Sequence, residues 1–133
     1  MEQALWVLKD KRISLLGLAY KPDTDDIRGS PAIELYKRLV AAGAQVRAFD
    51  PQAMGKARAV CPGIACGANA YEVAGHADAI TIATEWDEFR QLDWERIRRL
   101  MTRPLVFDAR NLLSPGRMKS LGFEYHSIGR PAV

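Results

Sequence analysis

Positively charged and aromatic side chains follow several of the apolar segments in this sequence. Tyr20, Lys21 and Arg28 come after the first apolar run, and Arg110 follows a later one. Lysine and arginine side chains bind phosphate groups, and an aromatic ring can stack on a flat base. These residue types therefore predict a nucleotide site, with the cations on the phosphates and a ring on the base.

Each of these residues also has a purely structural interpretation. Lys21 and Arg28 could pair with the acidic side chains between them and hold a long loop in shape. Trp86, a second candidate for stacking, could equally be a core residue. The acidic segment Asp23–Asp26 lacks the glycine and the distal glutamate of an EF-hand loop, so we expect no metal site there.

The pattern of apolar segments predicts the elements that must position these residues. Short apolar runs typical of buried strands alternate with segments of helical spacing. Ser30-Pro31 is typical of a helix start, with the serine hydroxyl as a cap and proline at the first helical position. We expect strands over residues 13–19, 45–49, 79–83, 105–107 and 124–126, and helices over residues 31–42, 53–60, 69–74, 93–101 and 115–121.

Strands that alternate with helices form a parallel sheet that is covered on both faces. The sequence therefore predicts an α/β, doubly wound, Rossmann-like fold of five or six strands. Ligands of such sheets bind beyond the carboxyl ends of the strands, which is where Tyr20, Lys21, Arg28 and Arg110 fall. The helix after Ser30 would add the favourable dipole of its N-terminus for an anion.

The first strand-to-helix turn does not have the residues of a dinucleotide site. Gly17 follows a strand, but Ala19 and Lys21 stand where the tight turn and the pyrophosphate need glycine. Asp50 ends the second strand at the position of a ribose-binding acid. We interpret Asp50 instead as a strand-end residue that fixes the turn into Pro51.

We find no constellation for catalysis in this chain. Cys61 and Cys66 flank Pro-Gly-Ile-Ala, a spacing that matches neither a redox motif nor a zinc motif. We interpret both as small, partly buried residues of a protein in the reducing cytoplasm. His76 and His126 are most simply a helix-end residue and a strand residue, so we expect binding rather than chemistry.

Length and composition exclude several classes of protein. The chain has 133 residues, of which 48% are hydrophobic and 26% charged, as expected for one globular domain. A net charge of +3 does not indicate a nucleic-acid surface, and we interpret the arginines at residues 96–103 as a solvated helix face. No apolar run is long enough for a membrane helix, and no signal peptide is expected. One domain of this size leaves little room for a two-substrate active site, so the chain could be a fragment.

Four motifs, in order and in register, carry a resemblance to a known family. Together they resemble the C-terminal, UDP-binding domain of the UDP-glucose/GDP-mannose dehydrogenase family, from about Ala4 to Arg130. The Thr84-Glu-Trp form of one motif favours the members that oxidise UDP-glucose. The matching motifs are Leu16–Ile33, Ala48–Pro51, Thr84–Phe89 and Val106–Asn111.

The resemblance implies roles for individual residues. Tyr20, where the family usually has phenylalanine, Lys21 and Arg110 would contact the UDP-sugar. Arg28 would reach across an interdomain cleft to NAD. Gly29 replaces a usual glutamate, which removes a charge from this loop, and Ala109 replaces a usual glycine beside Arg110.

The resemblance also implies an enzyme larger than this chain. The family oxidises the sugar's C6 alcohol to a carboxylate with two NAD, using a cysteine motif and an N-terminal glycine motif that are absent here. Residues 1–10 would be the end of the interdomain helix and residues 11–133 the UDP-sugar-binding domain, inactive alone. We expect an N-terminal dehydrogenase domain as partner and a homodimer at full length, with the fragment monomeric.

Two other interpretations remain open. The enzyme could oxidise another nucleotide sugar, such as GDP-mannose or UDP-N-acetylmannosamine. Alternatively, the chain could be a free-standing nucleotide-binding module without any oxidoreductase role.

Overall fold

A six-stranded parallel sheet forms the centre of the computed structural model, which describes residues 9–20 and 24–127. The strands pair in the order β3-β2-β1-β4-β5-β6. Their bounds are Arg12–Leu16 (β1), Gln45–Phe49 (β2), Ala65–Cys66 (β3), Ala79–Ile82 (β4), Leu105–Asp108 (β5) and Glu124–Ser127 (β6). The predicted doubly wound fold is confirmed.

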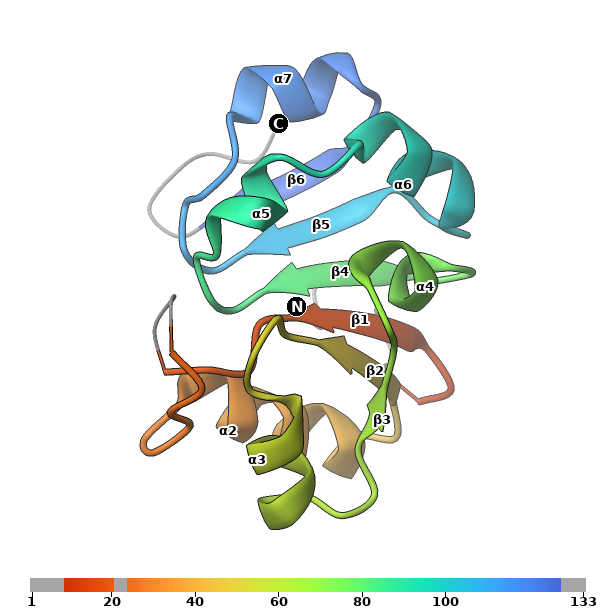
Figure 1. Cartoon of the computed structure of the whole chain (residues 1–133). Coiled ribbons are helices and arrows are strands. Elements are labelled where there is room, and N and C mark those ends of the chain that lie inside the picture. The colour runs from red at the N-terminus through yellow and green to blue at the C-terminus, as the bar shows by residue number, and fades with distance from the viewer. Residues whose placement is uncertain (1–8, 21–23, 128–133) are drawn as a thin grey trace.

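Helices connect successive strands. They are Pro31–Ala41 (α2), Met54–Val60 (α3), Ala70–Ala74 (α4), Asp87–Arg90 (α5), Trp94–Leu100 (α6) and Pro115–Ser120 (α7). In Figure 1, α2 and α3 lie beside the lower half of the sheet, and α5, α6 and α7 beside the upper half. The chain reverses its direction across the sheet between β3 and β4, so β1 and β4 lie side by side at the centre.

Strand β1 is buried from Ile13 onwards, and it pairs with β2 on one side and β4 on the other. Ile13, Leu15 and Leu16 are at most 1% exposed. Even Ser14 is buried on β1, and its hydroxyl donates a hydrogen bond to the carbonyl of Val73. This explains why the sequence shows a continuous apolar run here and not an alternating pattern.

The structure corrects the predicted end of this first strand. We expected residues 13–19, but β1 ends at Leu16 because Gly17 adopts a left-handed conformation with φ of 102°. The N–H of Gly17 donates to the carbonyl of Phe49, 2.9 Å away, and the chain then leaves the sheet. Leu18 and Ala19 are buried, so their apolar character reflects packing outside the strand.

The predicted cap of α2 is also wrong in one respect. The helix does start at Pro31, but the hydroxyl of Ser30 makes no capping hydrogen bond. It donates instead to the carbonyl of Leu18, at 2.8 Å. Ser30 therefore ties the start of the helix to the segment after β1, while the first turn of α2 has no side-chain cap.

Two elements were not predicted. β3 has only two residues and α5 only four, so neither is long enough to show a period. Of residues 1–10, the expected end of an interdomain helix, residues 1–8 lie outside the described residues. Within the described part of the chain, no helix is long and apolar enough to cross a membrane.

Candidate functional site

The carboxyl ends of the strands form the edge at which we expected ligand binding. In Figure 1 the strand arrowheads and the described part of the loop between β1 and α2 lie on the same, left-hand side. Tyr20 follows β1 and Arg110 follows β5, and both strands pair with β4. The two strand ends are thus separated by about 10 Å, twice the strand spacing. Lys21 lies outside the described residues.

Tyr20 stands at the base of this loop with its side chain accessible. The residue is 52% exposed, although it is aromatic. Its backbone N–H donates to the carbonyl of Asp26, at 2.6 Å, which closes the loop on itself. A tyrosine on a fixed backbone with an open ring can stack on a planar group.

Arg28 forms the ion pair that the structural interpretation allowed. Its Nε and Nη2 donate to the two carboxylate oxygens of Asp26, at 3.1 and 2.9 Å. The arginine side chain is nevertheless 91% exposed. The pair therefore orients the guanidinium without burying it, so the charge stays available to an anion.

Arg28 also sets the titration of Asp26. Its side-chain and backbone hydrogen bonds lower the pKa of this carboxyl from 3.8 to about 2. Because the folded-state pKa is lowered, the pair is complete above pH 3.8 and is lost as the pH falls through about 2. We expect an NMR titration of the carboxyl carbon to give a midpoint near 2, moving towards 3.8 in Arg28→Ala. Lys56→Ala is the control, since Lys56 makes the smallest contribution, and an equal shift in both variants would contradict this assignment.

Arg110 is held from two neighbouring strand ends. Its Nη2 donates to Oε1 of Glu85, at 3.0 Å, and its backbone N–H donates to Oδ1 of Asp108, at 3.0 Å. Its side chain is 33% exposed, and its Nε has no hydrogen-bond partner among the described residues. The sequence did not reveal the role of Glu85, although its position just after β4 was a usable signal.

Trp86 is a core residue, so our stacking interpretation of it was wrong. It is only 6% exposed, and its indole Nε1 donates to Oδ2 of Asp50, at 3.0 Å. Asp50 itself accepts from the backbone N–H groups of Gln52 and Ala53, both at 2.8 Å. The interpretation of Asp50 as the residue that fixes the turn into Pro51 is confirmed.

The turn after β1 does not fit a dinucleotide. Leu18 and Ala19 carry the N–H groups that would face a pyrophosphate, and both already donate to Asp50, at 2.8 and 3.0 Å. Asp50 is fully buried, so its carboxylate is closed to a ribose. In the described part of this turn, the groups that bind a dinucleotide in other proteins of this fold are therefore already bonded within the chain.

The cysteines and histidines have structural positions. Cys61 is buried at the end of α3, and Cys66 lies on β3, where burial raises the pKa of its thiol. A raised pKa makes a thiolate nucleophile less available. His76 follows α4 and His126 lies on β6, as predicted. No cluster of three metal-binding side chains occurs in residues 9–20 and 24–127.

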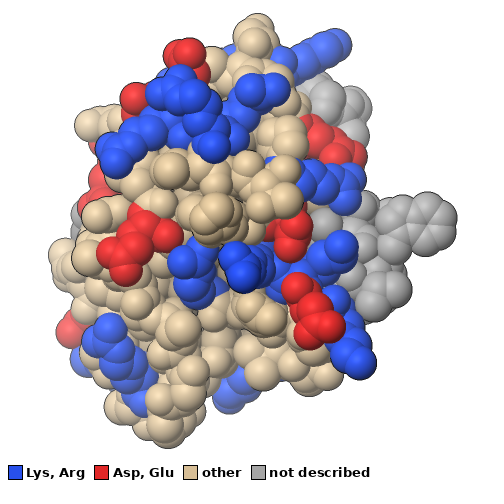
Figure 2. Space-filling view, turned by 90° about the vertical axis from the view of Figure 1, so that its right-hand side faces the viewer, with Lys and Arg blue, Asp and Glu red and all other residues tan. Residues whose placement is uncertain are grey.

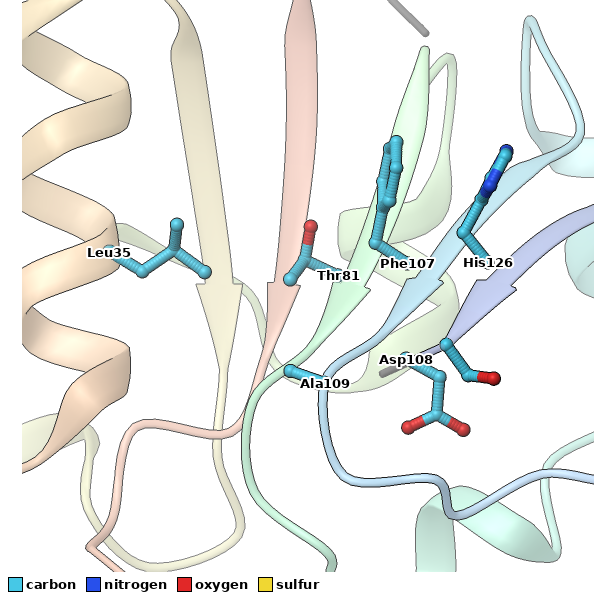
Figure 3. Close-up of a pocket in the computed structure, with 7 residues that line it drawn as sticks. Leu35, Thr81, Phe107, Asp108, Ala109 and His126 are labelled. Carbon is cyan, nitrogen blue, oxygen red and sulfur yellow. The ribbon is translucent and has the colours of Figure 1, made fainter. Parts of the chain in front are cut away.

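A hollow on one face of the sheet is a separate feature. Figure 3 shows Leu35 of α2 facing Thr81, Phe107 and His126 on neighbouring strands, and the rings of Phe107 and His126 stack at 5.2 Å. Its described lining contains no lysine or arginine. Phosphate groups are bound by such cationic side chains, so the strand ends are the better candidates for a nucleotide site.

Figure 2 views the side at which the strands begin, and its basic side chains are interspersed with acidic ones. Arg99 pairs with Glu95 at 3.4 Å, and Arg103 pairs with Glu124 at 3.0 Å. Arg96, Arg98 and Arg99 are exposed on α6 or its end, in agreement with a solvated helix face. On this side of the molecule, acidic side chains thus offset the charge of the basic ones.

Three kinds of comparison agree with these features. Residues 14–115 match the model of the UDP-glucose/GDP-mannose dehydrogenase family, UDP binding domain. The chain is 45% identical over 124 residues to the UDP-glucose 6-dehydrogenase of Rhizobium meliloti, covering 93% of this chain and 28% of that protein. It is 42% identical over 135 residues to the UDP-glucose 6-dehydrogenase of Pseudomonas aeruginosa, covering 97% of this chain and 29% of that protein.

Solved structures show the same relationship. A UDP-glucose dehydrogenase from Pyrobaculum islandicum superposes with a TM-score of 0.79 at 30% identity, over 94% of this chain and 27% of the other. The UDP-D-ManNAc dehydrogenase from Pyrococcus horikoshii superposes with a TM-score of 0.77 at 32% identity, over 97% of this chain and 28% of the other. The chain thus spans less than a third of the length of these relatives. The match over residues 14–115 contains Tyr20, Arg28 and Arg110, and the chain belongs to the UDP-glucose/GDP-mannose dehydrogenase family as its UDP binding domain.

Proposed function

We propose that this chain is the UDP-sugar-binding, C-terminal domain of an NAD-dependent UDP-glucose 6-dehydrogenase. The observation that carries the proposal is the position of Tyr20, Arg28 and Arg110. All three follow strands at one edge of the sheet, within the segment matched by the family model. The 45% identity to a UDP-glucose 6-dehydrogenase supports the choice of UDP-glucose.

In the proposed site, Tyr20, Lys21 and Arg110 bind the UDP-sugar. Arg110 offers a guanidinium already oriented by Glu85, and Tyr20 offers an open ring on a closed backbone. An oriented cation loses little entropy when it binds a phosphate or a sugar hydroxyl. Binding and orientation of the substrate are therefore the contribution of this chain.

NAD is the proposed cofactor of the whole enzyme, where two molecules accept the four electrons removed from the C6 alcohol. The turn after β1 does not fit NAD, so we assign this chain only one contact with NAD, from the exposed guanidinium of Arg28.

Residues 11–133 form the proposed domain, and residues 1–10 end the helix that joins it to an N-terminal dehydrogenase domain. We expect a homodimer at full length. The free thiols of Cys61 and Cys66 support a cytoplasmic location.

The test uses Lys21→Ala and Arg110→Ala in the enzyme that contains this chain. Losing a charge-assisted contact costs about 1.5–3 kcal/mol, so KM for UDP-glucose should rise by roughly ten- to a hundredfold. Lys119→Ala on α7 is the matched control, because Lys119 lies away from the strand ends, and it should leave KM unchanged. Wild-type KM values in both site variants would refute the proposed site.

A second substrate has a specific observation in its favour. The UDP-D-ManNAc dehydrogenase from Pyrococcus horikoshii is as similar in structure as the UDP-glucose enzyme, with TM-scores of 0.77 and 0.79. Turnover of UDP-glucose, UDP-N-acetylmannosamine and GDP-mannose by the same preparation separates these candidates. We expect UDP-glucose to have the highest kcat/KM.

A further inference from the structure

A single carboxylate, that of Asp50, joins three segments at the carboxyl edge of the sheet. Its Oδ2 accepts from the N–H groups of Leu18 and Ala19 and from the indole of Trp86, at 2.8 to 3.0 Å. Its Oδ1 accepts from the N–H groups of Gln52 and Ala53. These five donors come from the segment after β1, the turn after β2 and the start of α5.

Two of these donors, the N–H groups of Leu18 and Ala19, correspond to groups that bind a phosphate in dinucleotide-binding folds. There, the N–H groups after the first strand point at a pyrophosphate. Here the N–H groups of Leu18 and Ala19 point at Asp50, which is fully buried. The chain thus supplies its own anion at this turn, and the turn becomes a fixed part of the structure.

The carbonyl groups of the same two residues are fixed as well. The Leu18 carbonyl accepts from the hydroxyl of Ser30, and the Ala19 carbonyl from the hydroxyl of Thr84, both at 2.8 Å. All four polar backbone groups of Leu18 and Ala19 therefore have partners on other elements. Tyr20 follows directly, so the loop that bears the proposed ligand contacts starts from a held backbone.

We propose that Asp50 is a positioning residue for the UDP-sugar site. It holds the backbone that leads into Tyr20, where the hydrogen bond from the Tyr20 N–H to the Asp26 carbonyl closes the loop. The side chains of Tyr20 and Arg28 therefore reach the ligand without a further entropic cost of ordering their backbone. Asp50 touches neither substrate nor cofactor. The expected effect of Asp50 on substrate binding rests on the proposed function, whereas its expected effect on the order of the loop does not.

The first test measures loop order without any ligand. Asp50→Asn keeps the shape of the side chain but replaces one carboxylate oxygen with an NH2 group, which cannot accept a hydrogen bond. We expect amide hydrogen exchange in residues 17–30 of the 133-residue chain to speed up by about tenfold or more. Exchange in α6 should stay as in the wild type. Unchanged exchange in residues 17–30 would overturn the proposal.

Asp78→Asn is the matched control. Its carboxylate also accepts a backbone N–H at β1, that of Arg12 at 2.9 Å, but at the opposite end of the strand. We expect it to leave exchange in residues 17–30 unchanged. Trp86→Phe removes one donor from Asp50 while its four backbone donors remain, so it should loosen the loop less than Asp50→Asn. Equal effects of Asp78→Asn and Asp50→Asn would show general destabilisation and refute positioning.

The second test measures substrate binding by the enzyme that contains this chain. Asp50→Asn should raise KM for UDP-glucose by about tenfold, equivalent to about 1.4 kcal/mol, with a smaller effect on kcat. Asp78→Asn should match the wild type. If Asp50→Asn speeds up amide exchange in the loop but keeps the wild-type KM, then the order of the loop does not affect substrate binding, and this part of the proposal is overturned. If the wild-type enzyme does not turn over UDP-glucose, the proposed function fails, while the exchange result still decides whether Asp50 orders the loop.

Discussion

Gly17→Ala lowers the free energy of unfolding by about 4 kcal/mol. Two effects add. At φ of 102° a side chain strains the backbone by about 1–2 kcal/mol, and a Cβ placed on Gly17 would lie 2.5 Å from Cβ and Oγ1 of Thr84 and 2.6 Å from its backbone nitrogen. Overpacking of a buried site costs a further 1–3 kcal/mol, roughly. Urea unfolding followed by tryptophan fluorescence measures the change.

Gly29→Ala separates the two effects. Gly29 also has a positive φ, of 67°, but no atom lies within 4 Å of a Cβ built there. It should therefore lose only about 1 kcal/mol, from the backbone alone. If Gly17→Ala and Gly29→Ala lower the free energy of unfolding equally, the close approach of Thr84 to Gly17 does not contribute to the loss.

Asp108→Ala has the second large expected effect, a loss of about 4 kcal/mol of unfolding free energy. This carboxylate is 1% exposed and accepts from the N–H groups of Arg110 and Leu113 and from the hydroxyl of Tyr125, at 3.0, 2.8 and 2.6 Å. Removing it takes this acceptor from three buried or half-buried donors, at about 1–3 kcal/mol each. Water recovers part of this loss, and the Leu113 carbonyl, 3.2 Å from the Tyr125 hydroxyl, recovers part of it for Tyr125. The same urea experiment measures this loss.

Tyr125→Phe is the control for Asp108→Ala. It removes only the hydroxyl and leaves both backbone N–H groups bonded to Asp108, so about 1–2 kcal/mol should be lost. Because Asp108 also holds the backbone of Arg110, Asp108→Ala should weaken nucleotide-sugar binding, whereas Tyr125→Phe should not. An Asp108→Ala loss no larger than that of Tyr125→Phe would show that the backbone contacts contribute little.

Much of the fold could be predicted because burial leaves a local trace in the sequence. The strand at residues 45–49 was predicted with its observed bounds, and the helices after Ser30 and Ser114 begin where their prolines indicated. Errors arose where apolar character had another cause. Leu18 and Ala19 are buried outside any strand, so the first strand was predicted to end three residues too late.

The candidate site was predicted less completely, because residue type does not reveal a partner. The sequence placed Tyr20, Arg28 and Arg110 at strand ends, and the topology brings those ends to one edge. It left open whether Arg28 pairs with an acid of its own loop, and the structure selects Asp26. It did not indicate that Glu85 orients Arg110, since these residues are 25 positions apart.

The sequence by itself determined the fold class, the family and the positions of the cations, since each depends on a local pattern or motif. Only the tertiary structure decided what Asp50 binds beyond its own turn, and what Trp86 and Thr84 do. Their partners lie 32 to 65 positions away, at Leu18, Asp50 and Ala19. Such contacts follow from the strand order, in which β1 lies between β2 and β4. That order results from packing the whole sheet, so no local segment of the chain encodes it.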